Sequence, residues 1–140
     1  MSHSLGAIYV HIIFGTKHRA DVLTPELHTE FTRLITPIIH GHGGRLISDG
    51  GMPDHVHLLV DLGRETSVAA LLREIKARSA VWLSKRTGTQ FSWQIGYGAF
   101  SVSPSSLRRV ARYIERQEEH HTHQDYQQEA RWMHAQAEHP

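Results

Sequence analysis

Residues 52–61 read MPDHVHLLVD, and both the fold and the chemistry expected of this chain are inferred first from this stretch. A β-strand over His55–Asp61 would place the imidazoles of His55 and His57 on one face, because side chains alternate along a strand. The apolar side chains on the opposite face would be Val56, Leu58 and Val60. Two imidazoles one residue apart can hold a metal ion, or can simply be polar side chains on the solvent face of a sheet.

The hydrophobic pattern predicts the other elements around this strand. A strand over residues 5–16 would carry Val10, Ile12 and Phe14 on one face and His11 on the other. Thr24 and Pro25 are a typical helix start, and Pro37 predicts a kink or a helix that is nearly finished there. The remaining predicted elements are a strand at 45–48, a turn at 49–54, a helix at 67–85, short strands within 91–103, a helix after Pro104 and a short helix after residue 122.

This order favours an α+β fold of the ferredoxin-like (split βαβ) type, with an antiparallel sheet and helices packed on one face. The first and third strands would be central neighbours, so His11 would lie with His55 and His57 on the open face. A C-terminal helix bearing Tyr113 is expected on that open face. Residues 1–140 would form a single domain, with a core over about 5–121 and a helical tail over about 122–140.

Composition excludes some classes of protein. The chain has no cysteine, so disulfide and thiol chemistry are excluded, and the apolar run at residues 7–14 is too short to cross a membrane. A cytoplasmic protein without membrane contact is therefore expected. The formal charge of +1 is balanced, but basic residues gather in 73–86 and 108–116, which predicts either nucleic-acid contact or ordinary solvated helix surfaces.

The helix predicted after Pro104 carries a second group of polar residues. Tyr113, Gln117 and His121 are spaced by four and would lie along one side of a helix. Tyr113 can be a half-buried packing residue or a nucleophile beside metal ligands. The competing tyrosines, Tyr9, Tyr97 and Tyr126, have no potential ligand one helical turn away.

Four motifs together carry a family resemblance over about residues 5–128. They are HIIFGTKHR at 11–19, PDHVHLLV at 53–60, WQIGYGAFSVS at 93–103 and YIERQEEHH at 113–121. In this order and spacing the chain resembles the single-tyrosine HUH transposases of the insertion sequence 200 type, a group also described as REP-associated-like tyrosine transposases. The resemblance implies that His55 and His57 are metal ligands, that Tyr113 is the nucleophile and that Gln117 is a third ligand, with His121 a possible substitute.

The same resemblance implies the activity and the partners. The expected reaction is cleavage and rejoining of single-stranded DNA at element ends through a 5′-phosphotyrosine, assisted by Mg²⁺ or Mn²⁺. The expected partners are DNA hairpins near those ends and a second copy of the chain, whose tyrosine helix can complete the site. His11 is expected to orient a ligand or a phosphate, unless it is a satisfied strand histidine. The candidate phosphate contacts are Lys17, Arg19, Lys76, Arg78, Lys85, Arg86, Arg108, Arg109 and Arg112.

Other interpretations of the sequence remain open. A domesticated relative that nicks chromosomal repeats would use the same residues. A ferredoxin-like nucleic-acid-binding module would need no chemistry, and a metal-dependent phosphodiesterase would use water in place of Tyr113. Trp93, Tyr97 and Phe100 can stack on unpaired bases, although core or hinge packing is favoured for each.

Overall fold

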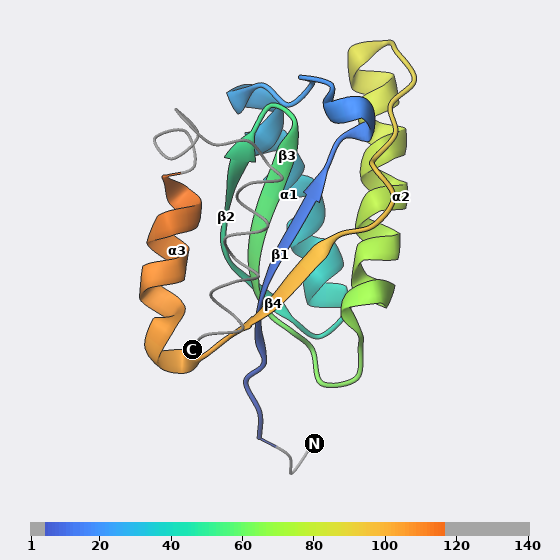
Figure 1. Ribbon diagram of the computed structural model, residues 1–140. Helices are drawn as coiled ribbons and strands as arrows, with labels where there is room; N and C mark the ends of the chain where they lie inside the picture. Colours follow the sequence, from blue (N-terminus) through green and yellow to red (C-terminus); the bar gives the residue numbers. More distant parts are fainter. Residues whose placement is uncertain (1–4, 117–140) are drawn as a thin grey trace.

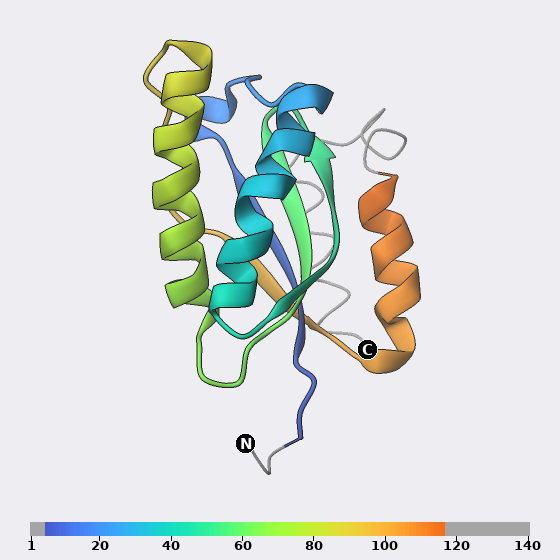
Figure 2. The same cartoon turned by 180° about the vertical axis from the view of Figure 1, so that it is seen from behind.

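The computed structural model describes residues 5–116 and contains one antiparallel sheet in the order β2-β3-β1-β4. Helices α1 and α2 cover one face of this sheet, and α3 lies beside β2 on the other side (Figures 1 and 2). The strands are β1 (Tyr9–Gly15), β2 (Arg45–Met52), β3 (His55–Asp61) and β4 (Gly98–Val102). The helices are α1 (Pro25–Gly41), α2 (Val68–Thr87) and α3 (Leu107–Glu115), with short 3-10 helices at Lys17–Arg19 and Pro104–Ser106.

This architecture confirms the ferredoxin-like α+β prediction, with β1 and β3 at the centre of the sheet. Gln117 and His121, the tail expected over 122–140 and Tyr126 lie outside the described residues.

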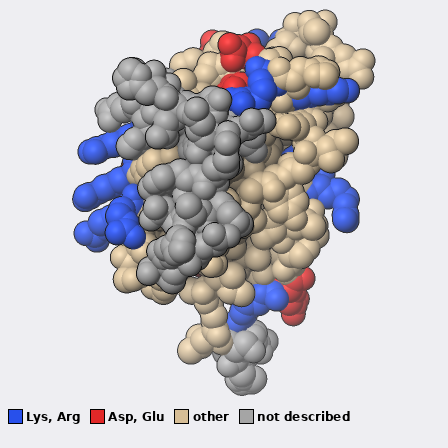
Figure 3. Space-filling model, viewed as in Figure 1, with Lys and Arg blue, Asp and Glu red and all other residues tan. Residues whose placement is uncertain are grey.

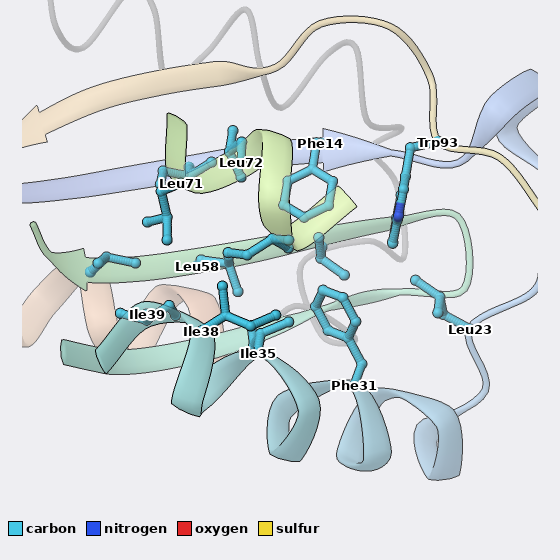
Figure 4. Packing of buried hydrophobic residues seen from close by; sticks show 14 of the residues in the cluster. Phe14, Leu23, Phe31, Ile35, Ile38, Ile39, Leu58, Leu71, Leu72 and Trp93 are labelled. Atoms are coloured by element: carbon cyan, nitrogen blue, oxygen red, sulfur yellow. The ribbon is translucent and has the colours of Figure 1, made fainter. Parts of the chain in front are cut away.

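The register of β1 against β3 decides which side chains face the helices. Ile12 lies opposite Leu58 and Phe14 opposite Val56, and all of them are buried in one cluster with residues of α1 and α2 (Figure 4). Because both central strands present aliphatic or aromatic side chains to the helices, burial of this face provides the main hydrophobic stabilisation of the fold.

The helix boundaries follow from capping residues. The Thr24 hydroxyl accepts a hydrogen bond from the Leu27 amide at the start of α1, and Ser67 accepts one from the Ala70 amide at the start of α2. Helix α1 ends at Gly41, about one turn after Pro37, in agreement with the prediction of a nearly finished helix. Gly88, in the left-handed conformation, ends α2.

Strand β2 differs from its prediction. Residues 49–54 were expected to form a turn, but β2 continues through Gly50 and Gly51 to Met52, and Gly50 pairs with His57 of β3. The turn is therefore confined to the two residues between the strands, Pro53 and Asp54. Glycine favours turns in sequence-based prediction, but Gly50 and Gly51 lie within the sheet, where they pair with His57 and Val56.

The segment before β4 is held against the core by aromatic packing. Trp93 forms an isolated bridge with Thr16, and its ring lies 4.8 Å from Phe14 and 4.9 Å from Phe91. Trp93 is buried, which supports core packing over base stacking, while Tyr97 is exposed and Phe100 is half-buried. Within residues 5–116, none of the helices combines the length and the apolar character that crossing a membrane requires.

Replacement of Phe31 by alanine tests this core. Phe31 is 1% exposed and packs against Phe14 and Trp93, so Phe31→Ala should lower the free energy of unfolding by about 3–5 kcal/mol. Val81 is 57% exposed on α2, and Val81→Ala should change the same quantity by less than about 0.5 kcal/mol. Urea unfolding followed by circular dichroism measures both, and a loss below about 1 kcal/mol for Phe31→Ala would contradict the packing described.

Candidate functional site

Three histidines gather on the face of the two central strands that is turned away from the apolar core under α1 and α2. His11 on β1 and His55 and His57 on β3 are all buried, with no exposed surface. His57 lies opposite Ile13, so His11 is its diagonal neighbour, and the distance from His11 Nε2 to His57 Nδ1 is 2.8 Å. The ring centroids of His55 and His57 are 5.1 Å apart. The alternation read from the sequence therefore brings together the histidines that it predicted.

Asp54, the residue before β3, holds the first histidine of this pair. Its Oδ1 lies 2.7 Å from His55 Nδ1, and its Oδ2 lies 2.9 Å from Arg19 Nε and 2.7 Å from the terminal guanidinium nitrogen. Burial raises the pKa of Asp54, but the hydrogen bonds and charges of His55 and Arg19 outweigh burial and lower the pKa to about 2. Asp54 is therefore ionised at neutral pH, and its Oδ1 can accept a hydrogen bond from His55 Nδ1.

Helix α3 brings Tyr113 to the same place. The ring centroids of Tyr113 and His57 are 6.3 Å apart, and the two rings meet edge to face at 78°. Sequence reasoning placed Tyr113 on this helix and left open whether it packed or reacted. The Tyr113 ring packs against His57, which is one of the predicted metal ligands.

A glycine on β2 lets α3 approach the histidine strand. Gly50 lies opposite His57, and a Cβ atom built on Gly50 would come within 2.2 Å of the carbonyl oxygen of Ile114. Ser48, on the same strand, places its Oγ 3.3 Å from both Ala111 O and Glu115 Oε1. Ile114 is fully buried. These contacts define the α3 seat, by which we mean Ser48 and Gly50 of β2 with Ile114 of α3.

The outer side of α3 is strongly basic. Tyr113 lines an open hollow of about 610 Å³ together with Ser105, Arg108, Arg109, Arg112 and Arg116. Basic side chains project from the side of the molecule where α3 lies (Figure 3). A phenol at the margin of a cationic hollow can meet a phosphate there, because clustered positive charge attracts anions.

The other predicted phosphate contacts have varied surroundings. Burial lowers the pKa of Lys76, whose Nζ donates to Gln94 O at 3.0 Å and Gly96 O at 2.7 Å. Arg78 pairs with Glu74, and Arg86 pairs with Glu26 and Glu30. Lys17 and Lys85 are exposed. These residues lie on two different elements of the molecule, and a role in DNA contact stays a prediction for each.

Sequence reasoning missed Asp54 as a partner of the histidines and Ser48 and Gly50 as the seat of α3. The signal for Asp54 was available, since a carboxylate adjacent to a ligand histidine is a common supporting residue. Gly50 and Ser48 gave no such signal in the sequence. Their roles appear only when α3 is in place, because α3 leaves no room for a side chain at Gly50 and contacts the Ser48 hydroxyl.

The donor set fits a divalent metal in part. Within residues 5–116, no three His, Cys, Asp or Glu side chains are grouped so as to hold a metal ion. The described part of the predicted ligand set is the pair His55 and His57, and its geometry suits the role, since His55 Nδ1 is engaged by a carboxylate as metal-bound imidazoles usually are. Gln117, the predicted third ligand, lies outside the described residues.

Comparison with known proteins gives consistent matches. A family model described as Transposase IS200 like matches residues 4–117. The ISDra2 transposase TnpA of Deinococcus radiodurans is 26% identical over 127 residues, which cover 84% of this chain and 91% of the relative. A crystal structure of a candidate transposase from D. radiodurans aligns with a TM-score of 0.66 at 23% identity, covering 84% of this chain and 95% of that chain.

A further solved structure, a REP-associated tyrosine transposase bound to a REP hairpin, aligns with a TM-score of 0.65 at 16% identity, covering 87% of this chain and 75% of that chain. At these levels of identity the two structural matches show the shared fold.

Adding a single methyl group at Gly50 tests the α3 seat. Gly50→Ala forces the new Cβ against the Ile114 carbonyl, so α3 should shift away from β2, the nuclear Overhauser contact between the Tyr113 and His57 rings should weaken, and the free energy of unfolding should fall by about 1–3 kcal/mol.

Gly41, at the end of α1, has no atom within 4 Å of its built Cβ. The control Gly41→Ala should therefore keep the ring contact and leave stability equal or slightly higher. An unchanged ring contact and unchanged stability in Gly50→Ala would refute the role of this glycine.

Proposed function

Because the chain belongs to the family of IS200-like transposases, we propose that it cleaves and rejoins single-stranded DNA through a covalent link between Tyr113 and a 5′-phosphate. The observation that carries the proposal is the position of the Tyr113 ring, 6.3 Å from the His57 ring and at the edge of an arginine-lined hollow. The proposed nucleophile then lies on α3 between the imidazoles and a basic surface that attracts phosphate.

The proposed reaction exchanges one phosphodiester for another. Tyr113 Oη attacks the scissile phosphorus, the bond from phosphorus to the 3′-oxygen breaks, and the phenolic proton is released while the departing 3′-oxygen gains a proton. The strand then carries its 5′-phosphate on Tyr113. In the second step a 3′-hydroxyl attacks that phosphorus and the bond to Tyr113 breaks, so no nucleoside triphosphate is needed.

The phenol needs assistance, because an unperturbed tyrosine has a pKa of about 10 and is a poor nucleophile at neutral pH. We assign His55 and His57, with Gln117, as the residues that hold a divalent cation, Mg²⁺ or Mn²⁺. When bound, such a cation would offset charge on the phosphate oxygens and on the leaving 3′-oxygen. His11 then serves as a positioning residue, since its Nε2 lies 2.8 Å from His57 Nδ1 and orients the ring.

Recognition of DNA is assigned to the basic surface of α3. Arg108, Arg109 and Arg112 line the hollow that Tyr113 also lines, and this supports phosphate contacts close to the scissile bond. A structural relative of this chain is described as bound to a REP hairpin, which supports hairpin DNA as the substrate class proposed for this protein.

A homodimer in which tyrosine helices are exchanged is part of the proposal. Within one chain α3 already lies against its own β2, and the segment that would redirect it is the short turn before α3. There the Ser103 hydroxyl lies 3.0 Å from Ser106 Oγ and 3.2 Å from Ser105 Oγ. A backbone hydrogen bond from Ser106 N to Ser103 O also holds this turn, and all of these polar contacts are exposed, so water can replace them when the helix is redirected.

The alternatives differ in what Tyr113 must do. A domesticated nicking relative would form the same covalent adduct, and the surroundings of the gene distinguish it. A phosphodiesterase that uses water would retain cleavage without Tyr113, and a module that only binds DNA would form no adduct.

Covalent capture of DNA tests the assignment of Tyr113. Purified protein is mixed with a labelled pool of single-stranded hairpin DNAs, with Mn²⁺ or Mg²⁺, and denaturing gels detect a protein–DNA adduct. Tyr113→Phe should lower adduct formation by at least roughly 1,000-fold, because no other group replaces the attacking oxygen. Tyr9→Phe, on the same face of the sheet, should behave as wild type. An adduct of normal yield in Tyr113→Phe would end the proposal.

The salt dependence of DNA binding tests the α3 surface. Replacing Arg108, Arg109 and Arg112 together by glutamine should reduce the slope of log K against log salt by about 2, since each lost phosphate contact to a single strand changes the slope by about 0.7. Arg45→Gln removes one exposed charge at the start of β2 and should leave the slope unchanged. Fluorescence anisotropy across a salt series measures both, and equal slopes for the triple variant and wild type would assign DNA contact elsewhere.

A further inference from the structure

The carboxylate of Asp54 divides its two oxygens between two different partners. Oδ1 accepts from His55 Nδ1 at 2.7 Å, whereas Oδ2 receives both contacts from Arg19, at 2.9 and 2.7 Å. Because the guanidinium occupies only one oxygen, the other oxygen stays directed at the imidazole. The side chains are 17% exposed for Asp54 and 32% exposed for Arg19, so the arrangement lies at the boundary between core and surface.

The loop that carries Arg19 is fastened to the residues before β3. Thr16 is fully buried, its amide donates to Asp54 O at 2.9 Å, and its hydroxyl lies 2.8 Å from Ala20 O. Leu23 donates its amide to Pro53 O at 2.9 Å. The loop after β1 and the turn before β3 therefore form one hydrogen-bonded unit.

Arg19 is held in this unit in an unfavourable backbone conformation. His18 and Arg19 have φ values of 59° and 57°, in the left-handed region that non-glycine residues rarely adopt because it is strained. Such a conformation persists only where surrounding contacts fix it. The ion pair to Asp54 is a contact of this kind, and it accounts for the direction in which the Arg19 side chain leaves the loop.

We infer that Arg19 and Asp54 act as a positioning pair that fixes the tautomer and the ring orientation of His55, and so prepares its Nε2 to ligate the divalent metal. The inference rests on the proposed function of the histidines. A carboxylate that already pairs with Arg19 accepts from the imidazole, so a neutral His55 carries its single proton on Nδ1, and its Nε2 then bears the lone pair that a metal requires. This gives Arg19 a role different from the phosphate contact that its sequence position predicts.

The energetics favour a positioning role over simple stabilisation. A partly exposed ion pair contributes little to stability, and here it lies beside two residues with strained left-handed backbones. Both oxygens of Asp54 are engaged, Oδ1 by His55 and Oδ2 by Arg19, so the carboxylate is held in the position from which it accepts from the imidazole. The pair is therefore better explained by what it does to His55 than by its own contribution to folding.

The tautomer of His55 provides a direct test that needs neither metal nor DNA. In protein labelled with ¹⁵N-histidine, long-range ¹H–¹⁵N spectra at pH 7.5 distinguish Nδ1–H from Nε2–H, and His55→Gln identifies the His55 signals. Wild type should hold His55 as Nδ1–H. Asp54→Ala should shift the population toward Nε2–H, Arg19→Gln should do so in part, and Arg19→Lys should restore part of the wild-type population.

Two results would overturn the inference: a wild-type His55 that carries its proton on Nε2, or an unchanged tautomer in both Asp54→Ala and Arg19→Gln. If Asp54→Ala fails to fold, Arg19→Gln alone decides, because its side chain is partly exposed and its loss removes no core packing. Arg45→Gln, at the opposite end of the sheet from His55, is the charge-matched control and should leave the tautomer unchanged.

Binding of Mn²⁺ alone gives a second readout. Electron paramagnetic resonance measures the free Mn²⁺ in a titration and so gives the affinity of each protein for Mn²⁺. The affinity of Asp54→Ala should be roughly 10- to 100-fold weaker than that of wild type, and the affinity of Arg19→Gln should lie between the two. Equal affinities in all three proteins would count against the pair. Neither measurement uses DNA cleavage. A failure of Tyr113 to form a DNA adduct would therefore refute the proposed reaction and leave the result for His55 unchanged.

Discussion

The antiparallel pairing of β1 with β3 is the constraint on which the rest of the molecule depends. A shift of one residue in this register would exchange the two faces of one strand relative to the other, and the imidazoles of the shifted strand would then point into the helices. In the observed register Ile12 meets Leu58 under the helices, while His11 and His57 meet on the open face. A single set of backbone hydrogen bonds therefore creates the apolar core and the candidate site together.

This coupling explains how much the sequence could predict. Alternation of apolar and polar residues was sufficient to assign faces to β1 and β3, because burial of one face selects the register. Capping residues such as Thr24 located helix starts for the same local reason. The α3 seat could not be predicted, since a glycine in a strand resembles a glycine in a turn until the neighbouring helix is known, and so Gly50 was misassigned.

Arginine residues show a similar limit. Arg19 follows Lys17 in a basic loop, and local sequence cannot distinguish an arginine that contacts phosphate from one that pairs with a carboxylate 35 positions away. The distinction depends on a long-range contact and on the left-handed backbone that directs the side chain. The position of Tyr113 on a helix was easier to predict, because helical spacing is local, while its role as the nucleophile stays a prediction.

The α3 seat has a consequence for how chains combine. In it, Gly50 leaves room for the helix, the Ser48 hydroxyl contacts Ala111 O and Glu115 Oε1, and Ile114 is buried. An identical neighbouring chain carries the same helix, so these contacts do not distinguish the two. The choice between the two is therefore left to the tether that precedes the helix. Mutations that change the length or stiffness of the segment before α3 can therefore change which copy of the chain supplies Tyr113. They need not alter the α3 seat.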